Sequence, residues 1–161
     1  MSGTLVIEEV DPQGPEAMSL LREAALEARS LYPELIASGA PTPTNPARQE
    51  RAAYFVAFLA GTPVGCGALR PLNGSTAEVR RMYVLQAYRR SGVARALLAH
   101  LQRAASTFHY TILRIETGNR QLSAMALYES FGFQRIAPFG EHANDPTSVC
   151  YEKRLTPVNQ P

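Results

Sequence analysis

The stretch AEVRRMYVLQAYRRSGVARALLAHL, from Ala77 to Leu101, decides how the rest of the chain is arranged. Its first eight residues, 77–84, are rich in β-branched and aromatic side chains, which predicts a β-strand. A basic turn of small residues, Arg89–Ala94, comes next. Beyond it, apolar side chains recur at the spacing of one helix face: Val93, Leu97, Leu98, Leu101 and Ala105. The stretch therefore predicts a strand, a basic turn and a helix in succession.

The start of this predicted helix has the features of a phosphate site. The first N–H groups of a helix have no internal partner, and the helix dipole is positive there. Gly92 allows a ligand to approach the backbone closely, and Arg89 and Arg90 add positive charge. The turn lacks the Gly-Lys-Ser/Thr of a Walker loop and the Gly-x-Gly-x-x-Gly of a dinucleotide fold. We expect a phosphate here, the alternative being a surface corner with two solvated arginines.

The same turn, Arg89-x-x-Gly92-x-Ala94, resembles the R/Q-x-x-G-x-G/A signature of the GNAT superfamily of acyl-CoA-dependent N-acyltransferases. The ending from Asp145 to Lys153 is similar to that of a large group of small bacterial members. Further stretches resemble successive blocks of the family, in the family's order: GCGALR at 65–70, AEVRRMYV at 77–84, ETG at 116–118 and ALYESFGF at 126–133. The resemblance covers the chain from about Ala52 to Leu155.

Length and composition limit the class of protein. A chain of 161 residues with 45% hydrophobic side chains is long enough to bury a core. We expect one acetyltransferase domain over 1–161, with its core at 4–155 and a frayed tail at 156–161. The net charge of +2 is too small to favour a nucleic-acid or anionic-membrane partner.

The cysteines and the hydropathy bear on the compartment. Cys66 and Cys150 lie in strand-like runs, and we expect two buried free thiols. No leader opens the chain, and no apolar run approaches the ~20 residues of a membrane span. A cytoplasmic location is the resulting expectation.

The other elements follow from local patterns. A helix should begin near Glu16, with an apolar stripe ending at Ala28, and stop at Tyr32-Pro33. A second short helix over 34–37 is one option, and the proline-rich Gly39–Pro46 must be a loop, either a connector or a binding segment. Asn73-Gly74 predicts a hairpin. Strands are expected at 4–10, 52–60, 63–72, 110–117, 133–138 and 149–155.

The last helix should follow Asn119. Asn119 is a candidate N-cap, and Gly132 stands where a C-terminal cap glycine belongs. Its expected apolar stripe consists of Leu122, Met125, Ala126 and Phe131.

These elements predict an α/β fold with a mixed, mostly antiparallel sheet. A helix crossover between the strands at 77–84 and 110–117 requires that pair to be parallel. Helices should lie on both faces of the sheet, as the resemblance also implies. In that family the parallel pair splays apart, and the pantetheine arm of acetyl-CoA enters between the two strands.

The resemblance implies acetyl-CoA as the co-substrate and names its contacts in this chain. Backbone groups near Met82, Tyr83 and Val84 would bond the pantetheine arm, and the Val84 N–H would hold the oxyanion. Gln121 stands where many relatives carry a cofactor-binding asparagine, and glutamine can make the same kinds of hydrogen bond. The pyrophosphate would lie on Arg89, Arg90, Ser91, Gly92, Val93, Ala94 and Arg95.

Acyl transfer to an amine requires a base for the ammonium proton and an acid for the departing thiolate. Glu78 matches the position of the base in many relatives, the alternative being a strand carboxylate paired with Arg80 or Arg70. Tyr128 resembles the tyrosine that relatives place beside the leaving sulfur, the alternative being a core tyrosine. Tyr32, Arg70 and His142 are further substrate-contact candidates. Nothing in the spacing of the histidines predicts a metal site.

The leading hypothesis is an N-acetyltransferase that acts on a small-molecule amine. A protein that binds acyl-CoA without turnover and a modifier of protein lysines or N-termini are the alternatives. The presence of both Glu78 and Tyr128 favours the enzyme over the sensor. The loop Gly39–Pro46 could shape a small pocket or a peptide groove, so it does not decide between acceptors. Dimers are common in the family, and a homodimer is expected on that ground alone.

Overall fold

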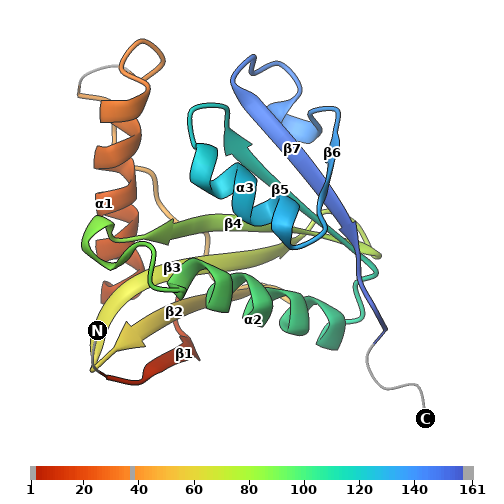
Figure 1. Cartoon of the computed structure of the whole chain (residues 1–161), viewed down its shortest axis with the longest axis horizontal. Coiled ribbons are helices and arrows are strands. Elements are labelled where there is room, and N and C mark those ends of the chain that lie inside the picture. Colours follow the sequence, from red (N-terminus) through yellow and green to blue (C-terminus); the bar gives the residue numbers. More distant parts are fainter. Residues whose placement is uncertain (1–2, 37–38, 158–161) are drawn as a thin grey trace. The chain divides into compact units, whose positions relative to one another are not determined.

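The computed structural model describes residues 3–36 and 39–157 (Figure 1). Two short 3₁₀ helices, η1 and η2, join the α-helices and strands. In chain order the elements are β1 (Leu5–Glu9), α1 (Pro15–Leu31), β2 (Ala53–Leu59), β3 (Thr62–Pro71), β4 (Thr76–Val84), η1 (Gln86–Tyr88), α2 (Val93–Thr107), β5 (Ile112–Gly118), α3 (Leu122–Ser130), β6 (Gln134–Ile136), η2 (Gly140–His142) and β7 (Ser148–Arg154).

The described residues form a seven-stranded mixed sheet in the order β1-β2-β3-β4-β5-β7-β6. β4 and β5 are parallel, as the helix crossover predicted, and their register joins Thr76–Val79 to Ile112–Ile115. β4 continues to Val84 and β5 to Gly118 beyond that register. The pairs β1–β2, β5–β7 and β6–β7 are antiparallel. The predicted fold class is confirmed.

The chain divides into two compact units that interleave along the sequence. The first unit comprises Met1–Ala68 and Arg81–His100, and the second comprises Leu69–Arg80 and Leu101–Pro161. Both units therefore take residues from β3, β4 and α2.

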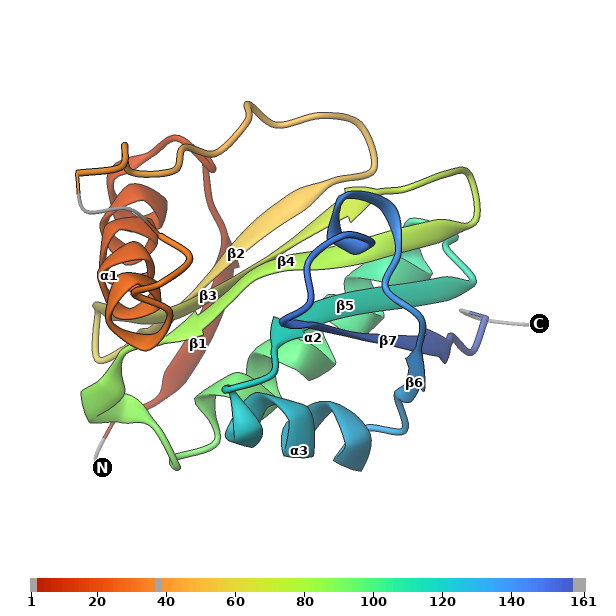
Figure 2. The same cartoon turned by 90° about the horizontal axis from the view of Figure 1, so that it is seen from above.

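In the first unit, α1 and the start of α2 cover opposite faces of β3 (Figure 2). Successive strand residues point to opposite faces. Cys66 packs in a cluster with Ala17 and Leu20 of α1. Its neighbour Gly65 faces α2 so closely that an added Cβ would lie 3.1 Å from side-chain atoms of Val93 and Leu97. Gly65 is therefore needed for close packing of the α2 helix on the strand.

The end of α1 differs in part from the expectation. The helix ends at Leu31, and Tyr32, its C-cap residue, donates its backbone N–H to the Ala28 carbonyl at 2.9 Å. Residues 33–35 form a turn instead of the optional second helix, because the backbone N–H groups of Leu35 and Ile36 both bond back to the Tyr32 carbonyl. Residues 37–38 lie outside the described residues, as does the tail beyond residue 157.

In the second unit, the hairpin at Asn73-Gly74 forms as predicted. The Asn73 side chain accepts the N–H groups of Ser75 and Thr76, each at 3.0 Å, and Leu72 N–H bonds to the Thr76 carbonyl at 2.9 Å. This bond sets the register of β3 and β4. Counting outward from Leu72 and Thr76 places Arg70 opposite Glu78.

The apolar stripe predicted for α3 is wrong. Leu122 is 70% exposed, Ala126 is exposed, and Tyr128 is the buried residue of the helix. The N-cap is Gln121, which makes no side-chain cap bond, and not Asn119, whose N–H bonds to the Thr147 carbonyl. A helix of nine residues buries little area, so its one large buried ring determines which side faces the sheet.

Cys66 and Cys150 are both free and buried, which confirms that expectation. Over residues 3–36 and 39–157, no helix combines the length and the apolar character that crossing a membrane requires.

Candidate active site

The N-terminus of α2, in the first unit, presents backbone N–H groups that precede the first intrahelical hydrogen bond. The first intrahelical bond runs from Ala96 N–H to the Gly92 carbonyl at 3.0 Å. The N–H groups of Val93 and Ala94, in the first turn, therefore have no acceptor within the helix. Gly92 has a φ of 87°, and an added Cβ would meet no atom within 4 Å. The turn is open to a ligand at the point where the sequence predicted a phosphate.

Arg89 is less available to a phosphate than the sequence suggested. Its Nε donates to the Val84 carbonyl at 2.9 Å, and its Nη2 pairs with both carboxylate oxygens of Glu27 on α1, at 2.7 and 2.8 Å. The Arg89 side chain is 39% exposed. Glu27 offsets the charge of Arg89, and the bonds of Arg89 connect the turn to β4 and α1. Arg90 is exposed to solvent. Ser91 closes the same turn through a bond from its hydroxyl to the Tyr88 carbonyl.

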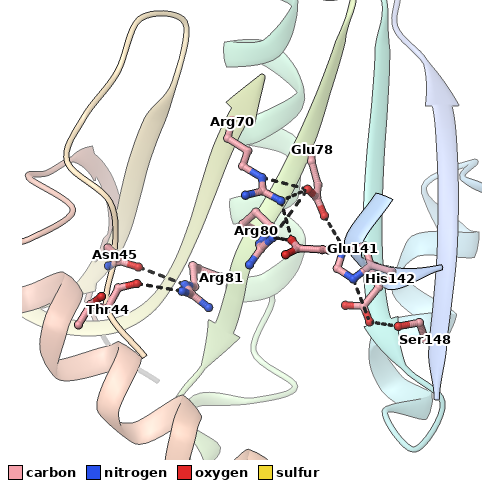
Figure 3. Close-up of polar contacts among 10 residues, drawn as sticks. Thr44, Asn45, Arg70, Glu78, Arg80, Arg81, Glu141, His142 and Ser148 are labelled. Atoms are coloured by element: carbon pink, nitrogen blue, oxygen red, sulfur yellow. Dashed lines mark hydrogen bonds and ion pairs between the residues drawn. The ribbon is translucent and has the colours of Figure 1, made fainter. Parts of the chain in front are cut away.

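The end of β4 in the first unit is bent at Arg81, which has a left-handed φ of 60°. The Arg81 carbonyl accepts a bond from Cys66 Sγ at 3.1 Å. Its guanidinium donates to Asn45 Oδ1 at 3.1 Å and to the Thr44 carbonyl at 3.2 Å (Figure 3). The buried Asn45 also donates to the Pro12 carbonyl at 2.7 Å. The proline-rich loop is thus attached to the strand from which Met82, Tyr83 and Val84 follow.

The second unit holds Glu78 in a buried ion-pair cluster. Its side chain is 1% exposed. Its Oε1 accepts Arg70 Nε at 3.0 Å and Arg70 Nη2 at 2.8 Å, and Arg80 Nη1 lies 3.9 Å away (Figure 3). Its Oε2 lies 2.9 Å from His142 Nε2. The pairing with Arg70 that the sequence left as an alternative is present, and His142 occupies the other oxygen.

His142 lies between two carboxylates. Its Nδ1 is 3.7 Å from Glu116 Oε2, and that oxygen also accepts the Ser148 hydroxyl at 2.6 Å. The Phe139 ring lies edge-on to the imidazole at 5.2 Å and limits its rotation. A neutral imidazole donates from one nitrogen and accepts at the other. His142 can therefore move a proton away from Glu78.

Strand alternation explains why these groups converge. Glu78 faces Arg114 across the parallel register, so both side chains stand on one face of the sheet. Glu116, two residues along β5, stands on the same face. The 3₁₀ helix η2 then brings Glu141 and His142 over that face, where His142 meets Glu78 and Glu116.

Glu141 links the two arginines from the solvent side. Its carboxylate accepts Arg70 Nη2 at 2.7 Å and also bonds to Arg80 Nη1. The hydrogen bonds from Arg80 and Arg70 lower the pKa of the Glu141 carboxyl below its ordinary value. Glu141 is therefore ionised at neutral pH. Its side chain is 56% exposed, so water also solvates the carboxylate.

Glu78, Glu141 and His142 offer three candidate metal-ligand atoms within 4.8 Å of one another. Both carboxylates already bond to guanidinium groups. A cation at this position would be repelled by Arg70 and Arg80. The donor set therefore fits an ion-pair network better than a metal site.

Tyr128 lies on the opposite face of the same part of the sheet. Its ring packs against Tyr151 at 5.9 Å and Phe133 at 6.2 Å, and Tyr151 stands opposite Ile115 in the β5–β7 register. Since Ile115 and Glu116 alternate, Tyr128 and Glu78 occupy different faces. Burial, and to a lesser degree the charge of Glu116, raise the pKa of the Tyr128 hydroxyl. The phenol therefore stays protonated at neutral pH and is available as a proton donor.

The remaining predicted site residues lie at helix ends. Gln121 is exposed at the start of α3, and Tyr32, 7% exposed, belongs to the first unit. The structure brings Arg70, Glu78 and His142 together in the second unit, whereas Tyr32 belongs to the first. Glu116, Glu141 and Ser148 also belong to this cluster and were not predicted from the sequence. Counting outward from the turn at Asn73-Gly74 could have placed Arg70 opposite Glu78, but no local signal in the sequence places η2 over the strands.

Comparison with known proteins gives consistent matches. The sequence model described as "Acetyltransferase (GNAT) family" matches residues 16–133. The chain is 40% identical over 104 residues to the uncharacterized N-acetyltransferase YsnE of Bacillus subtilis. The aligned segment spans 63% of this chain and 69% of that protein. It is 38% identical over 103 residues to an IAA acetyltransferase of Azospirillum brasilense, spanning 63% and 67% of the two chains.

Solved structures show the same fold. A protein from Klebsiella pneumoniae, described as an acyl-CoA N-acyltransferase, superposes with a TM-score of 0.76 and 30% identity, over 94% of this chain and 98% of the other. A GNAT family acetyltransferase from Elizabethkingia anophelis, solved with acetyl-CoA bound, superposes with a TM-score of 0.67 over the same shares of the two chains. At 19% sequence identity, this match shows a shared fold and nothing about the substrate.

Proposed function

Because the chain belongs to the GNAT acetyltransferase family and is an N-acetyltransferase, we propose that it moves the acetyl group of acetyl-CoA to the primary amine of a small molecule, by direct attack in a ternary complex. The observation that carries the proposal is the buried Glu78 carboxylate, 2.9 Å from an imidazole that lies between two carboxylates. Such a group can receive a proton and pass it on.

Each step of the reaction has a residue to perform it. Glu78, with His142 behind it, takes a proton from the ammonium so that the free amine can attack the thioester carbonyl carbon. The C–N bond forms, and the Val84 N–H is the proposed donor to the oxyanion. When the C–S bond breaks, the electron pair leaves with sulfur, and Tyr128 supplies the proton that makes the thiol. The nitrogen gives up its second proton as the amide forms, and a proton returned through solvent restores the Tyr128 phenol. The opposite faces of Glu78 and Tyr128 suit an amine and a sulfur on opposite sides of the carbonyl carbon.

The cofactor contacts are proposed in the same way. The pyrophosphate is assigned to the backbone at 89–95, supported by the position of the Val93 and Ala94 N–H groups at the start of α2 and by the free space at Gly92. The pantetheine arm is assigned to backbone groups of Met82–Val84, beyond the β4–β5 register. Gln121, exposed at the start of α3, is a further contact.

Acetyl-CoA is expected to stabilise the protein against heat. A ligand that binds only the folded state adds about 2.7 kcal/mol at 100 times its Kd. Differential scanning fluorimetry with acetyl-CoA, NAD and ATP at equal concentrations measures this. A rise in melting temperature with NAD or ATP and none with acetyl-CoA would contradict the cofactor assignment.

Gly92→Glu is expected to abolish acetyl-CoA binding while the fold is retained. A carboxylate at the helix N-terminus would occupy the phosphate position and repel the ligand. The matched control is Gly61→Glu, since Gly61 has a similar φ of 81° and equally open surroundings in the same unit. A left-handed conformation costs a residue with a side chain roughly 1–2 kcal/mol, so both variants should lose similar stability. If calorimetry showed that Gly92→Glu binds acetyl-CoA as tightly as the wild type, the pyrophosphate would have to bind at another position.

The acceptor is tested by measuring free thiol release from acetyl-CoA with a panel of small amines, amino acids and peptides. Relatives differ in what their names record: one is an N-acetylaspartate synthetase of Xenopus tropicalis, and a neighbour in fold is a ribosomal-protein-S18-alanine N-acetyltransferase of Escherichia coli. Turnover with small amines supports the proposal. Turnover with peptides alone would assign a protein acceptor, and binding of acetyl-CoA without any turnover would assign a sensor.

A further inference from the structure

Arg70 and Arg80 are bridged on their solvent side by one carboxylate from η2 (Figure 3). That carboxylate belongs to Glu141, whose side chain is 56% exposed, whereas the side chains of Arg70 and Arg80 are 38% and 26% exposed. Arginine binds carboxylates through paired N–H donors, and an ion pair this exposed contributes little to stability. Another carboxylate can therefore replace Glu141 at small cost.

The charge balance of the cluster favours such an exchange over simple loss of Glu141. Glu78 is buried, and its carboxylate already bonds to Arg70 and His142. Its single negative charge therefore cannot balance both guanidinium groups. Without Glu141, two guanidinium groups would face one carboxylate. An incoming carboxylate restores the balance and accepts the same N–H donors.

We infer that Arg70 and Arg80 form a subsite for a carboxylate of the acceptor, and that Glu141 occupies it when no acceptor is bound. The acceptor is then an amine that also carries a carboxylate, as a free amino acid does. In an α-amino acid the amine is attached to the carbon next to the carboxylate. A carboxylate on these arginines therefore holds the amine near Glu78, which bonds to the same Arg70. The inference rests on the proposed function and narrows its substrate class.

The test compares each L-amino acid with its carboxamide as the acceptor in the thiol-release assay. The two have nearly the same shape but differ in charge and in the pKa of the amine, so kcat/KM is compared for the deprotonated amine of each. Charged hydrogen bonds are strong enough for at least a tenfold preference for the acid. Arg80→Gln should lower this acid-to-amide preference about tenfold, because the amide does not use the guanidinium charge. Arg103→Gln, at an exposed position of α2 in the same unit, is the control and should leave the preference unchanged.

Glu141→Gln should act in the opposite direction. Removing the competing charge is expected to lower KM for the acids a few-fold and to leave KM for the amides as it was. A purely structural role of Glu141 would change acids and amides alike, and that result would overturn the inference.

The two levels of the proposal fail separately. Equal use of acids and amides overturns the carboxylate subsite and leaves the acetyltransferase proposal intact. No thiol release with any amine overturns the proposed function. In that case, calorimetric titration of the same amino acids, with CoA present, tests the subsite alone: binding weakened about tenfold in Arg80→Gln supports it, and no binding or equal binding overturns it.

Discussion

Tyr128→Phe is expected to slow turnover by about 100-fold or more, because general acid catalysis contributes roughly 10²–10⁴ in rate. The substitution removes the hydroxyl and keeps the ring that packs against Phe133 and Tyr151. Folding and acetyl-CoA affinity should therefore stay close to those of the wild type. Melting temperature, calorimetric affinity and kcat, measured on the same preparation, separate the acid role from a core role.

Tyr151→Phe is the matched control for this variant. Tyr151 is a buried tyrosine next to Tyr128, and its hydroxyl donates to Glu129 Oε2 at 2.8 Å. Loss of that bond to a charged carboxylate should cost about 1.5–3 kcal/mol of stability and little turnover. If Tyr128→Phe behaved like this control, losing stability and keeping activity, Tyr128 would be a core tyrosine.

Glu78→Gln should give the second large effect, a loss of about 10²–10⁴ in kcat/KM near neutral pH. The amide keeps the shape of the side chain but cannot accept the proton of the ammonium. As the pH rises toward the pKa of the amine, about 10.4 for a lysine-like group, more acceptor is already deprotonated. The defect should therefore shrink with pH, and a pH–rate profile of both proteins measures this.

Glu152→Gln controls for the loss of an ion pair. Glu152 accepts Arg114 Nε at 2.9 Å in the same unit, and both side chains are about one-third exposed (32% and 31%). The control should lose at most about 1 kcal/mol of stability and retain the pH profile of the wild type. Wild-type rates for Glu78→Gln across the whole pH range would reduce Glu78 to a structural partner of Arg70 and His142.

The sequence by itself determined the features that depend on neighbouring residues. The β-branched and aromatic side chains at 77–84 predicted β4, the small basic residues at 89–94 predicted the turn, and the apolar face beyond them predicted α2. The crossover length then required the parallel β4–β5 pair, and Asn73-Gly74 formed the hairpin that sets Arg70 opposite Glu78. Backbone conformation and side-chain periodicity are local properties, so short stretches encode them.

Only the tertiary structure decided which charges meet. His142 is 64 residues from Glu78 along the chain, and Glu141 is 71 from Arg70. Glu27, 62 residues from Arg89, offsets the charge that the turn was expected to offer a phosphate. The stripe predicted for α3 failed for the same reason, because burial of Tyr128 depends on Tyr151 and Phe133 from β7 and the chain before β6. Ion pairs and burial arise between segments far apart in sequence, and no local pattern specifies the partner.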